Sequence, residues 1–174
     1  SDRGDLPFQH YFVRYQCAPA VSGFNFDGIS AARPNRKCFG LLQRHQFGAI
    51  VICPSNPLVS VDPILQVPGL WLALRNSPAP VVLVSPIVAG QAIKGPAAKM
   101  MKEMGMAVTA LGVARHYCAR YPGLVDYFVI DQSDATLADE ISAQGVTVAV
   151  TGTIMNSRED KQQLARFCLQ LVGA

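Results

Sequence analysis

Serine, asparagine and proline residues follow directly on a short apolar run, at Pro54-Ser55-Asn56-Pro57 with Ser60 three residues further on. Ser and Asn side chains accept backbone N–H bonds, and proline is common at the first position of a helix, so this stretch contains a helix start. At the carboxyl end of a parallel strand, free N–H groups, hydroxyls and an amide could hold an anion such as a phosphate. A tight turn without a ligand explains the same residues equally well.

A lysine stands before a second helix start, at Lys94-Gly95-Pro96. The lysine adds a full charge to the partial positive charge of a helix N-terminus, and Gly95 lets a ligand approach the backbone, which together favour phosphate. Ser85 opens the loop that leads to this pair, directly after an apolar run. The alternative interpretation is an ordinary solvated lysine beside a helix start.

Two carboxylates and a hydroxyl follow the later apolar runs, as Asp131, Asp134 and Thr153. The carboxylates could bind a metal, a ribose hydroxyl or the N–H groups of the next helix, and capping by Asp134 or Ser133 is the commonest of these roles. Thr153 could contact a ligand, although such a position is more often a turn. No Ser/His/Asp or Cys/His set can be assembled from the spacing, so the catalytic residues stay unassigned.

Apolar runs that resemble buried strands alternate with segments of helical spacing from residue 48 onward. The expected strands are residues 48–53, placed centrally in the sheet, 81–84, 127–130 and 146–150. The expected helices are residues 36–44, 70–75, 97–104, 137–144 and 158–171, while 107–113 fits a strand or, from Val113, the start of a helix. Residues 6–18 and 21–26 have the alternation of strands. These elements predict an α/β fold, Rossmann-like, with a mostly parallel sheet, helices on both faces and a β-rich N-terminal portion.

Composition excludes several functional classes. The chain has 174 residues, enough for one domain, and no apolar run reaches the roughly 18 residues of a membrane span. Its formal charge is only +3 and its basic residues are dispersed, so no nucleic-acid footprint is indicated. The five cysteines lack CxxC spacing, which favours neither a zinc site nor disulfides and fits a reducing cytoplasm. No GxGxxG follows a strand, which disfavours a nicotinamide dehydrogenase.

Taken in order, the motifs from residue 48 to residue 166 resemble the 2-phospho-L-lactate transferase family of deazaflavin biosynthesis. The matching stretches are Pro54-Ser55-Asn56-Pro57 with Ser60 and Pro63-Ile64-Leu65, Val84-Ser85-Pro86-Ile87, Lys94-Gly95-Pro96-Ala97, Gly112-Val113-Ala114 with Tyr117, Phe128-Val129-Ile130-Asp131 with Asp134, and Thr153-Ile154-Met155. Each motif alone is weak, but their common order makes the match specific.

The resemblance implies an enzyme that moves a 2-phospho-L-lactate or phosphoenolpyruvate-type moiety from a guanosine-diphosphate donor to the ribityl hydroxyl of the deazaflavin Fo. GMP leaves, and Mg²⁺ is required. The residues that would bind the phosphates or the nucleotide are Pro54, Ser55, Asn56, Ser60, Ser85, Lys94 and Gly95. Those that would contact the substrate or a ribose are Asp131, Asp134 and Thr153.

The chain departs from this family at its start. Family members begin with a strand and a glycine-rich turn, followed by acidic residues for the metal and Fo, and these 174 residues resemble only the C-terminal part. We therefore expect a single α/β domain or a fragment, without metal ligands of its own and inactive alone. Which acid the donor carries stays open, and an exposed sheet edge makes a homo-oligomer plausible. The alternative is a non-catalytic UDP-sugar-binding regulatory protein of the same fold, a group that usually has a Gly-Ser-rich first loop.

Overall fold

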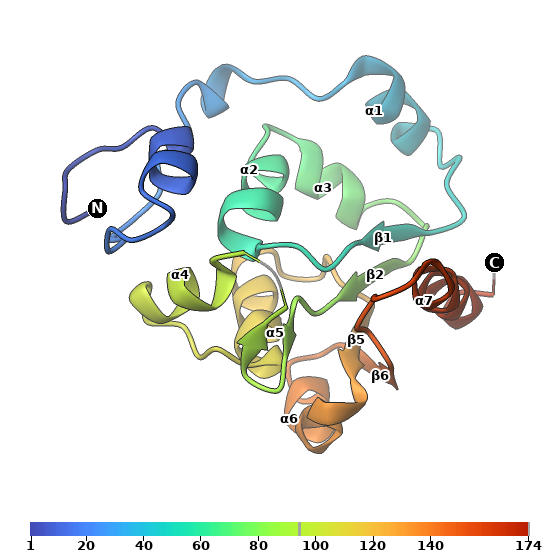
Figure 1. Ribbon diagram of the computed structural model, residues 1–174. Helices are drawn as coiled ribbons and strands as arrows, with labels where there is room; N and C mark the ends of the chain where they lie inside the picture. The colour runs from blue at the N-terminus through green and yellow to red at the C-terminus, as the bar shows by residue number, and fades with distance from the viewer. Residues whose placement is uncertain (94, 174) are drawn as a thin grey trace.

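A four-stranded parallel sheet forms the centre of the computed structural model, which describes residues 1–93 and 95–173 (Figure 1). Its strands are β1 (Ile50–Ile52), β2 (Val81–Val84), β5 (Tyr127–Asp131) and β6 (Thr147–Thr151), in the order β1-β2-β5-β6. Leu83 lies opposite Phe128, and Phe128 lies opposite Val148. The predicted α/β fold with a mostly parallel sheet is confirmed.

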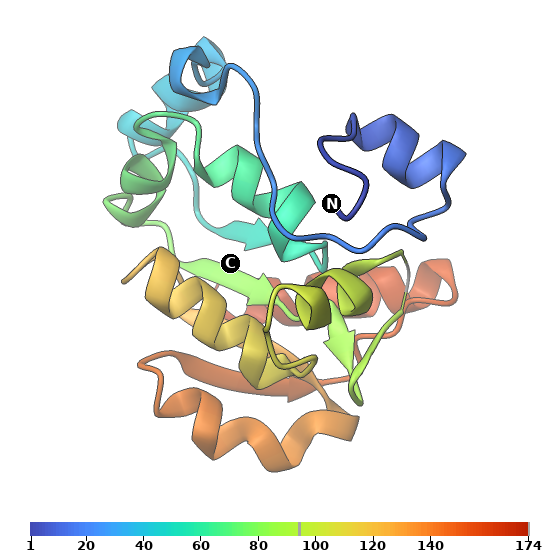
Figure 2. The same ribbon diagram turned by 90° about the vertical axis from the view of Figure 1, so that its left-hand side faces the viewer.

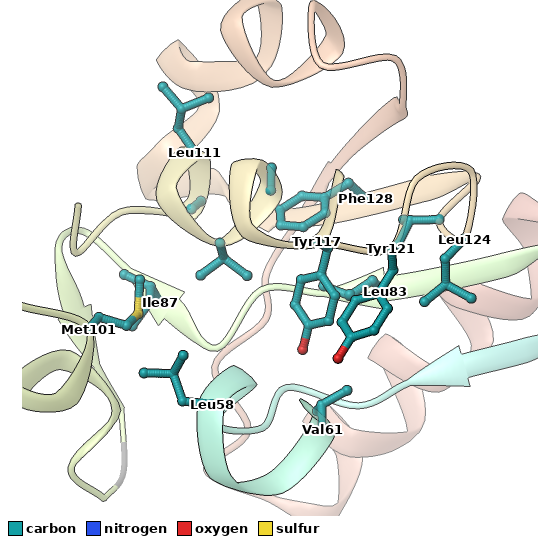
Figure 3. Close-up of a cluster of buried hydrophobic side chains, with 14 of the residues drawn as sticks. Leu58, Val61, Leu83, Ile87, Met101, Leu111, Tyr117, Tyr121, Leu124 and Phe128 are labelled. Carbon is teal, nitrogen blue, oxygen red and sulfur yellow. The ribbon is translucent and has the colours of Figure 1, made fainter. Parts of the chain in front are cut away.

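The two faces of the sheet are covered unequally. Alternate residues of β2 point to opposite faces, so Leu83 joins the larger core while Val82 joins a smaller one. The larger core lies under η3 (Pro57–Val61), α2 (Asp62–Leu65), α4 (Ala97–Glu103) and α5 (Ala110–Arg120) (Figure 3). The smaller core lies under α7 (Arg158–Leu171), whose Leu164 and Cys168 face the sheet. Helices therefore cover both faces, as expected.

Strand β1 lies at an edge of the sheet, which corrects its expected central place. It pairs with β2 alone among the described residues, and Val51 is 39% exposed. An apolar run without polar alternation predicts burial on both faces. Here only one face of β1 packs against the larger core. That face is turned toward η3 and α2 and carries Ile50 and Ile52.

The remaining helices follow the predicted segments closely. They are α1 (Arg36–Gln43), α3 (Leu70–Arg75) and α6 (Ala138–Ser142), the last preceded by the 3₁₀ helix η4 (Gln132–Leu137). The segment 107–113 is not a strand. The Thr109 hydroxyl accepts a hydrogen bond from the Gly112 N–H and caps the start of α5. This cap favours a helix over a strand, a choice that the apolar periodicity of the segment left open.

The N-terminal portion contains no strand among residues 1–49, so the expected β-rich start is wrong. Its elements are two short helical segments, η1 (His10–Arg14) and η2 (Ile29–Ala31), joined by extended chain. The aromatic residues recur at helical as well as alternating spacing, and Phe8 and Phe12 stack with ring centroids 5.6 Å apart. The helical spacing prevails because no neighbouring strand pairs with this segment.

A small antiparallel hairpin follows β2 and was not expected. It pairs β3 (Ile87–Val88) with β4 (Gln91–Ala92) through the two-residue turn Ala89-Gly90. Figure 2 shows the N-terminal segment crossing beside α2 and α4. No helix in the described part of the chain combines the length and apolarity needed to cross a membrane.

Candidate functional site at the carboxyl edge of the sheet

The parallel order of the strands brings most of the predicted site residues to one edge. The loops that follow β1, β2, β5 and β6 all leave the sheet at the carboxyl ends of their strands. Ligands of open α/β sheets bind at such an edge. The structure thus groups the loops that begin at Cys53, Ser85, Asp131 and Gly152.

Asn56 shapes the first of these loops. Its side-chain oxygen accepts hydrogen bonds from the N–H groups of Leu58 at 2.9 Å and Val59 at 3.4 Å, which caps η3. Its amide nitrogen lies 3.2 Å from the sulfur of Met100 in α4. The N-cap interpretation of Asn56 is therefore what the geometry shows, and the side chain ties η3 to α4.

The backbone N–H groups of this turn are already bonded within it. Besides the two N–H groups that Asn56 caps, those of Ser60 and Val61 donate to the Asn56 carbonyl. The expected free N–H groups of residues 58–61 are thus not available to an anion. A ligand at this loop would contact hydroxyls instead, since Ser55 is half-buried and Ser60 is exposed, with Pro54 half-buried beside them.

Ser85 is enclosed in the loop after β2. It is 1% exposed, its hydroxyl donates to the Ile87 carbonyl at 2.9 Å, and it accepts from the Ile87 N–H at 3.2 Å. Its own N–H continues the ladder to Val129 of β5. The hydroxyl therefore shapes the entry into the β3–β4 hairpin.

Gly95 lies before α4 with a φ of +71°, and a Cβ atom there would meet nothing within 4 Å. The backbone at this position is therefore open to an approaching group. Lys94, the expected phosphate partner, lies outside the described residues. Pro96 takes the N-cap position of α4.

Asp131 joins the ends of β5 and β6. One carboxylate oxygen accepts from the Thr153 N–H at 2.8 Å and from the Thr153 hydroxyl at 3.1 Å, and the other accepts from the Ser133 N–H at 3.0 Å. Burial on its own raises the pKa of Asp131, but the hydrogen bonds from Thr153 and Ser133 together outweigh it and lower that pKa. Asp131 and Thr153 thus form one buried link between two loops.

Asp134 serves a similar purpose for the hairpin. It is 6% exposed, and both of its oxygens lie within 3.2 Å of the Ala89 N–H, which donates to them. This bond ties η4 to the β3–β4 turn. The expectation that the loops of Asp131 and Asp134 lie at the carboxyl edge of the sheet agrees with the strand order. In the structure, both carboxylates accept hydrogen bonds from backbone N–H groups.

The carboxylates of this edge are not gathered into a cluster of metal-binding side chains among the described residues. Across residues 1–93 and 95–173, no group of three or more His, Cys, Asp or Glu side chains is placed to hold a metal ion. Magnesium prefers carboxylate oxygens together with water and phosphate oxygens, whereas Asp131 and Asp134 are turned toward N–H donors.

A buried polar cluster between α2 and α5 was missed by sequence reasoning. Asp62, 4% exposed, accepts from His116 Nε2 and from the Tyr121 hydroxyl, each at 3.1 Å, and its second oxygen lies 3.4 Å from Arg120 Nε. The spacing of His116 and Arg120, four residues apart on one helix, was the signal that could have indicated a shared partner.

Comparison with known proteins identifies relatives across almost the whole chain. Residues 2–165 match the family model of the 2-phospho-L-lactate transferase CofD. A phosphoenolpyruvate transferase of Mycobacterium ulcerans is 32% identical over 169 residues, which cover 97% of this chain and 49% of the relative. A 2-phospho-L-lactate transferase of Methanosarcina barkeri is 34% identical over 168 residues, covering 95% and 51%.

Among solved structures, a member of the upf0052 family from Bacillus halodurans is similar to this chain. The TM-score is 0.46 at 17% identity, with 78% of this chain and 46% of that chain covered. The chain spans about half the length of the curated relatives that it matches. The match to the family model extends from the N-terminal segment into α7, and the chain therefore belongs to the 2-phospho-L-lactate transferase CofD family.

Proposed function

We propose that this chain takes part in the transfer of a 2-phospho-L-lactate or phosphoenolpyruvate-type moiety from a guanosine-diphosphate donor to the deazaflavin Fo. The observation that carries the proposal is the family match over residues 2–165, with relatives named as transferases of these two acids. The convergence of the motif loops on one sheet edge supports it. The chemistry would belong to coenzyme F420 biosynthesis in the cytoplasm.

In the proposed step, the ribityl hydroxyl oxygen of Fo attacks the phosphorus that carries the acid. A new P–O bond forms, the P–O bond to GMP breaks with its electron pair going to GMP, and the hydroxyl proton is released to solvent. Such transfers depend mainly on alignment and on charge stabilisation. The role of this chain is then to hold the donor, with Ser55 and Ser60 as hydroxyl contacts and Gly95 as the point where the backbone comes close to a phosphate.

We expect the 174 residues alone to bind the donor nucleotide and to form no product. The carboxylates at the edge, Asp131 and Asp134, are engaged by Thr153, Ser133 and Ala89, so no step through Mg²⁺ is assigned to them. Product formed from Fo and a donor by this chain alone would contradict the expectation.

Calorimetric titration tests the proposal. GDP, UDP-N-acetylglucosamine and NAD are titrated separately, with Mg²⁺ and with or without Fo. Selective GDP binding that changes when Fo is present supports the transferase, and UDP-sugar binding without a response to Fo supports the regulatory alternative. A hydrogen bond to a charged phosphate contributes about 1.5–3 kcal/mol, so Ser60→Ala should weaken GDP binding by about tenfold or more. The control Ser142→Ala, on the exposed side of α6, should not weaken it.

A further inference from the structure

The net positive charge of the chain is concentrated around α1. Residues 28–61 hold four of the fifteen Lys and Arg residues, Arg33, Arg36, Lys37 and Arg44, and none of the twelve Asp and Glu residues. The rest of the chain therefore has eleven basic residues against twelve acidic ones. The formal charge of +3 thus comes from this one stretch, although basic residues as such are dispersed along the sequence.

Three of these basic residues are arginines that surround one groove. The groove has a volume of about 530 Å³, and its described lining residues are Pro68 and eight-tenths of a turn to two turns of chain within residues 32–43, Arg33 and Arg36 among them. Gly40 also lines it, and a Cβ atom on Gly40 would lie 3.7 Å from a guanidinium nitrogen of Arg44. We call this the basic groove. Figure 1 shows α1 on the outer side of α3, away from the sheet.

The guanidinium groups of the basic groove are available to a partner. No salt bridge joins Arg33, Arg36 or Arg44 to a carboxylate within residues 1–93 and 95–173, and all three side chains are exposed. Positive charges gathered in this way repel one another, so a negatively charged partner is attracted by all of them and offsets their repulsion. The planar fork of N–H donors in arginine matches the geometry of a carboxylate.

The basic groove also offers apolar surface. Phe39, half-buried, lines it together with Pro34 and Pro68. Gly40 is unfavourable inside a helix, but it leaves this part of the groove without a side chain. Arginine and aromatic residues are enriched in protein interfaces and among the residues that contribute most to binding. A partner with both carboxylates and an apolar side chain therefore fits the groove best.

The extent of the groove favours a peptide segment over a small anion. Its arginines are distributed over α1 and the residues beside it, a helix of about 12 Å, so one phosphate or carboxylate ion contacts only part of the groove. An extended peptide advances about 3.3 Å per residue, and a few residues with alternate acidic side chains follow the whole groove. Outside residues 28–61 the charges are nearly balanced, so no further excess of positive charge is present to follow a long nucleic-acid backbone.

We propose that the basic groove binds an acidic segment of a partner protein. Carboxylates of the segment pair with Arg33, Arg36 and Arg44, and one apolar side chain packs against Phe39. The groove shares no residue with the loops at the carboxyl edge of the sheet, so this interaction goes beyond the proposed function and does not depend on it.

The test measures binding of a labelled peptide to the 174-residue chain by fluorescence anisotropy. The probe has about ten residues, with glutamates alternating around one central phenylalanine. The double substitution Arg33→Gln with Arg36→Gln should weaken binding about tenfold through loss of two exposed charge pairs. The matched control, Lys161→Gln with Arg166→Gln at exposed sites of α7, removes the same charge and should leave binding unchanged.

Support for the proposal is binding at a physiological ionic strength of about 0.15 M that is lost when glutamine replaces each glutamate of the probe. Absence of binding by the unmodified chain under these conditions overturns it. Equal weakening in the two double variants also overturns it, because it shows that net charge alone attracts the peptide. If a single-stranded oligonucleotide binds more tightly than the peptide and only the groove variant weakens it, the groove is a nucleic-acid site and the proposal is again overturned.

Discussion

His116 Nε2 lies 3.1 Å from an oxygen of Asp62, across 54 residues of sequence, and ties α5 to the first turn of α2. The Tyr121 hydroxyl donates to the same oxygen, also at 3.1 Å. Asn56 fixes the start of η3 and Asp62 fixes its end. The loop that carries Ser60 is therefore held at both ends by side chains that reach other elements.

Replacement of Asp62 should test this anchoring. Asp62→Ala leaves His116 and the Tyr121 hydroxyl without their buried acceptor, and we expect the free energy of unfolding to fall by about 1–3 kcal/mol. Urea unfolding measures the change. Asp2→Ala, at an exposed aspartate, is the matched control and should change stability by less than about 0.5 kcal/mol. Equal effects of the two substitutions would contradict a structural role for Asp62.

Asp131 should make stability depend on pH in the acid range. Its pKa in the folded state is lowered, because the hydrogen bonds from Thr153 and Ser133 outweigh the effect of burial. A lowered folded pKa gives stability that is present above the unfolded value, about 3.9, and is lost as the pH falls through the folded value. Asp131→Asn should therefore lose less stability between pH 6 and pH 3 than the unmodified chain. Urea unfolding at both pH values measures this, and parallel losses would refute it.

Local patterns predicted the helices and the parallel strands well. The structure of the buried run Val81–Val84 and of the capped helix Arg158–Leu171 is determined by residues close together in the sequence. Periodicity and capping are therefore sufficient to predict such elements. The order of the strands depends on contacts between distant segments. The edge position of β1 could not be seen from its own apolar run.

In the candidate site, too, features set by the order of the strands were predicted, and contacts between distant residues were not. The loops beginning at Ser85 and Asp131 were correctly expected at one edge, because parallel strands end there. The partners of their side chains were not predictable, since Asp134 bonds to Ala89 at a distance of 45 residues along the chain.

Replacement of Gly112 by alanine should lower stability more than the same replacement at a glycine with free space for a Cβ atom. A Cβ atom at this position would collide with the backbone carbonyl of Ala107, which the start of α5 holds close. Gly112→Ala should therefore cost about 1–3 kcal/mol of stability through overpacking. Gly48→Ala is the control, because nothing lies within 4 Å of that position, and it should be neutral or slightly stabilising. Thermal unfolding of both variants decides, and equal melting temperatures would disprove the collision.

Ala89 lies at a position where glycine should be tolerated at least as well as alanine. Its φ of +48° and that of Gly90, +74°, form a two-residue hairpin turn of the kind that favours Gly or Asn, and the Asp134 carboxylate holds the Ala89 N–H in place. Left-handed backbone costs an alanine about 1–2 kcal/mol, so Ala89→Gly should leave stability unchanged or raise it by about 0.5 kcal/mol. In the control Ala165→Gly, at an exposed site inside α7, the same replacement should lower stability by about 1 kcal/mol. Urea unfolding should give opposite signs or a clear difference between the two, and equal destabilisation would show that the turn does not need its positive φ.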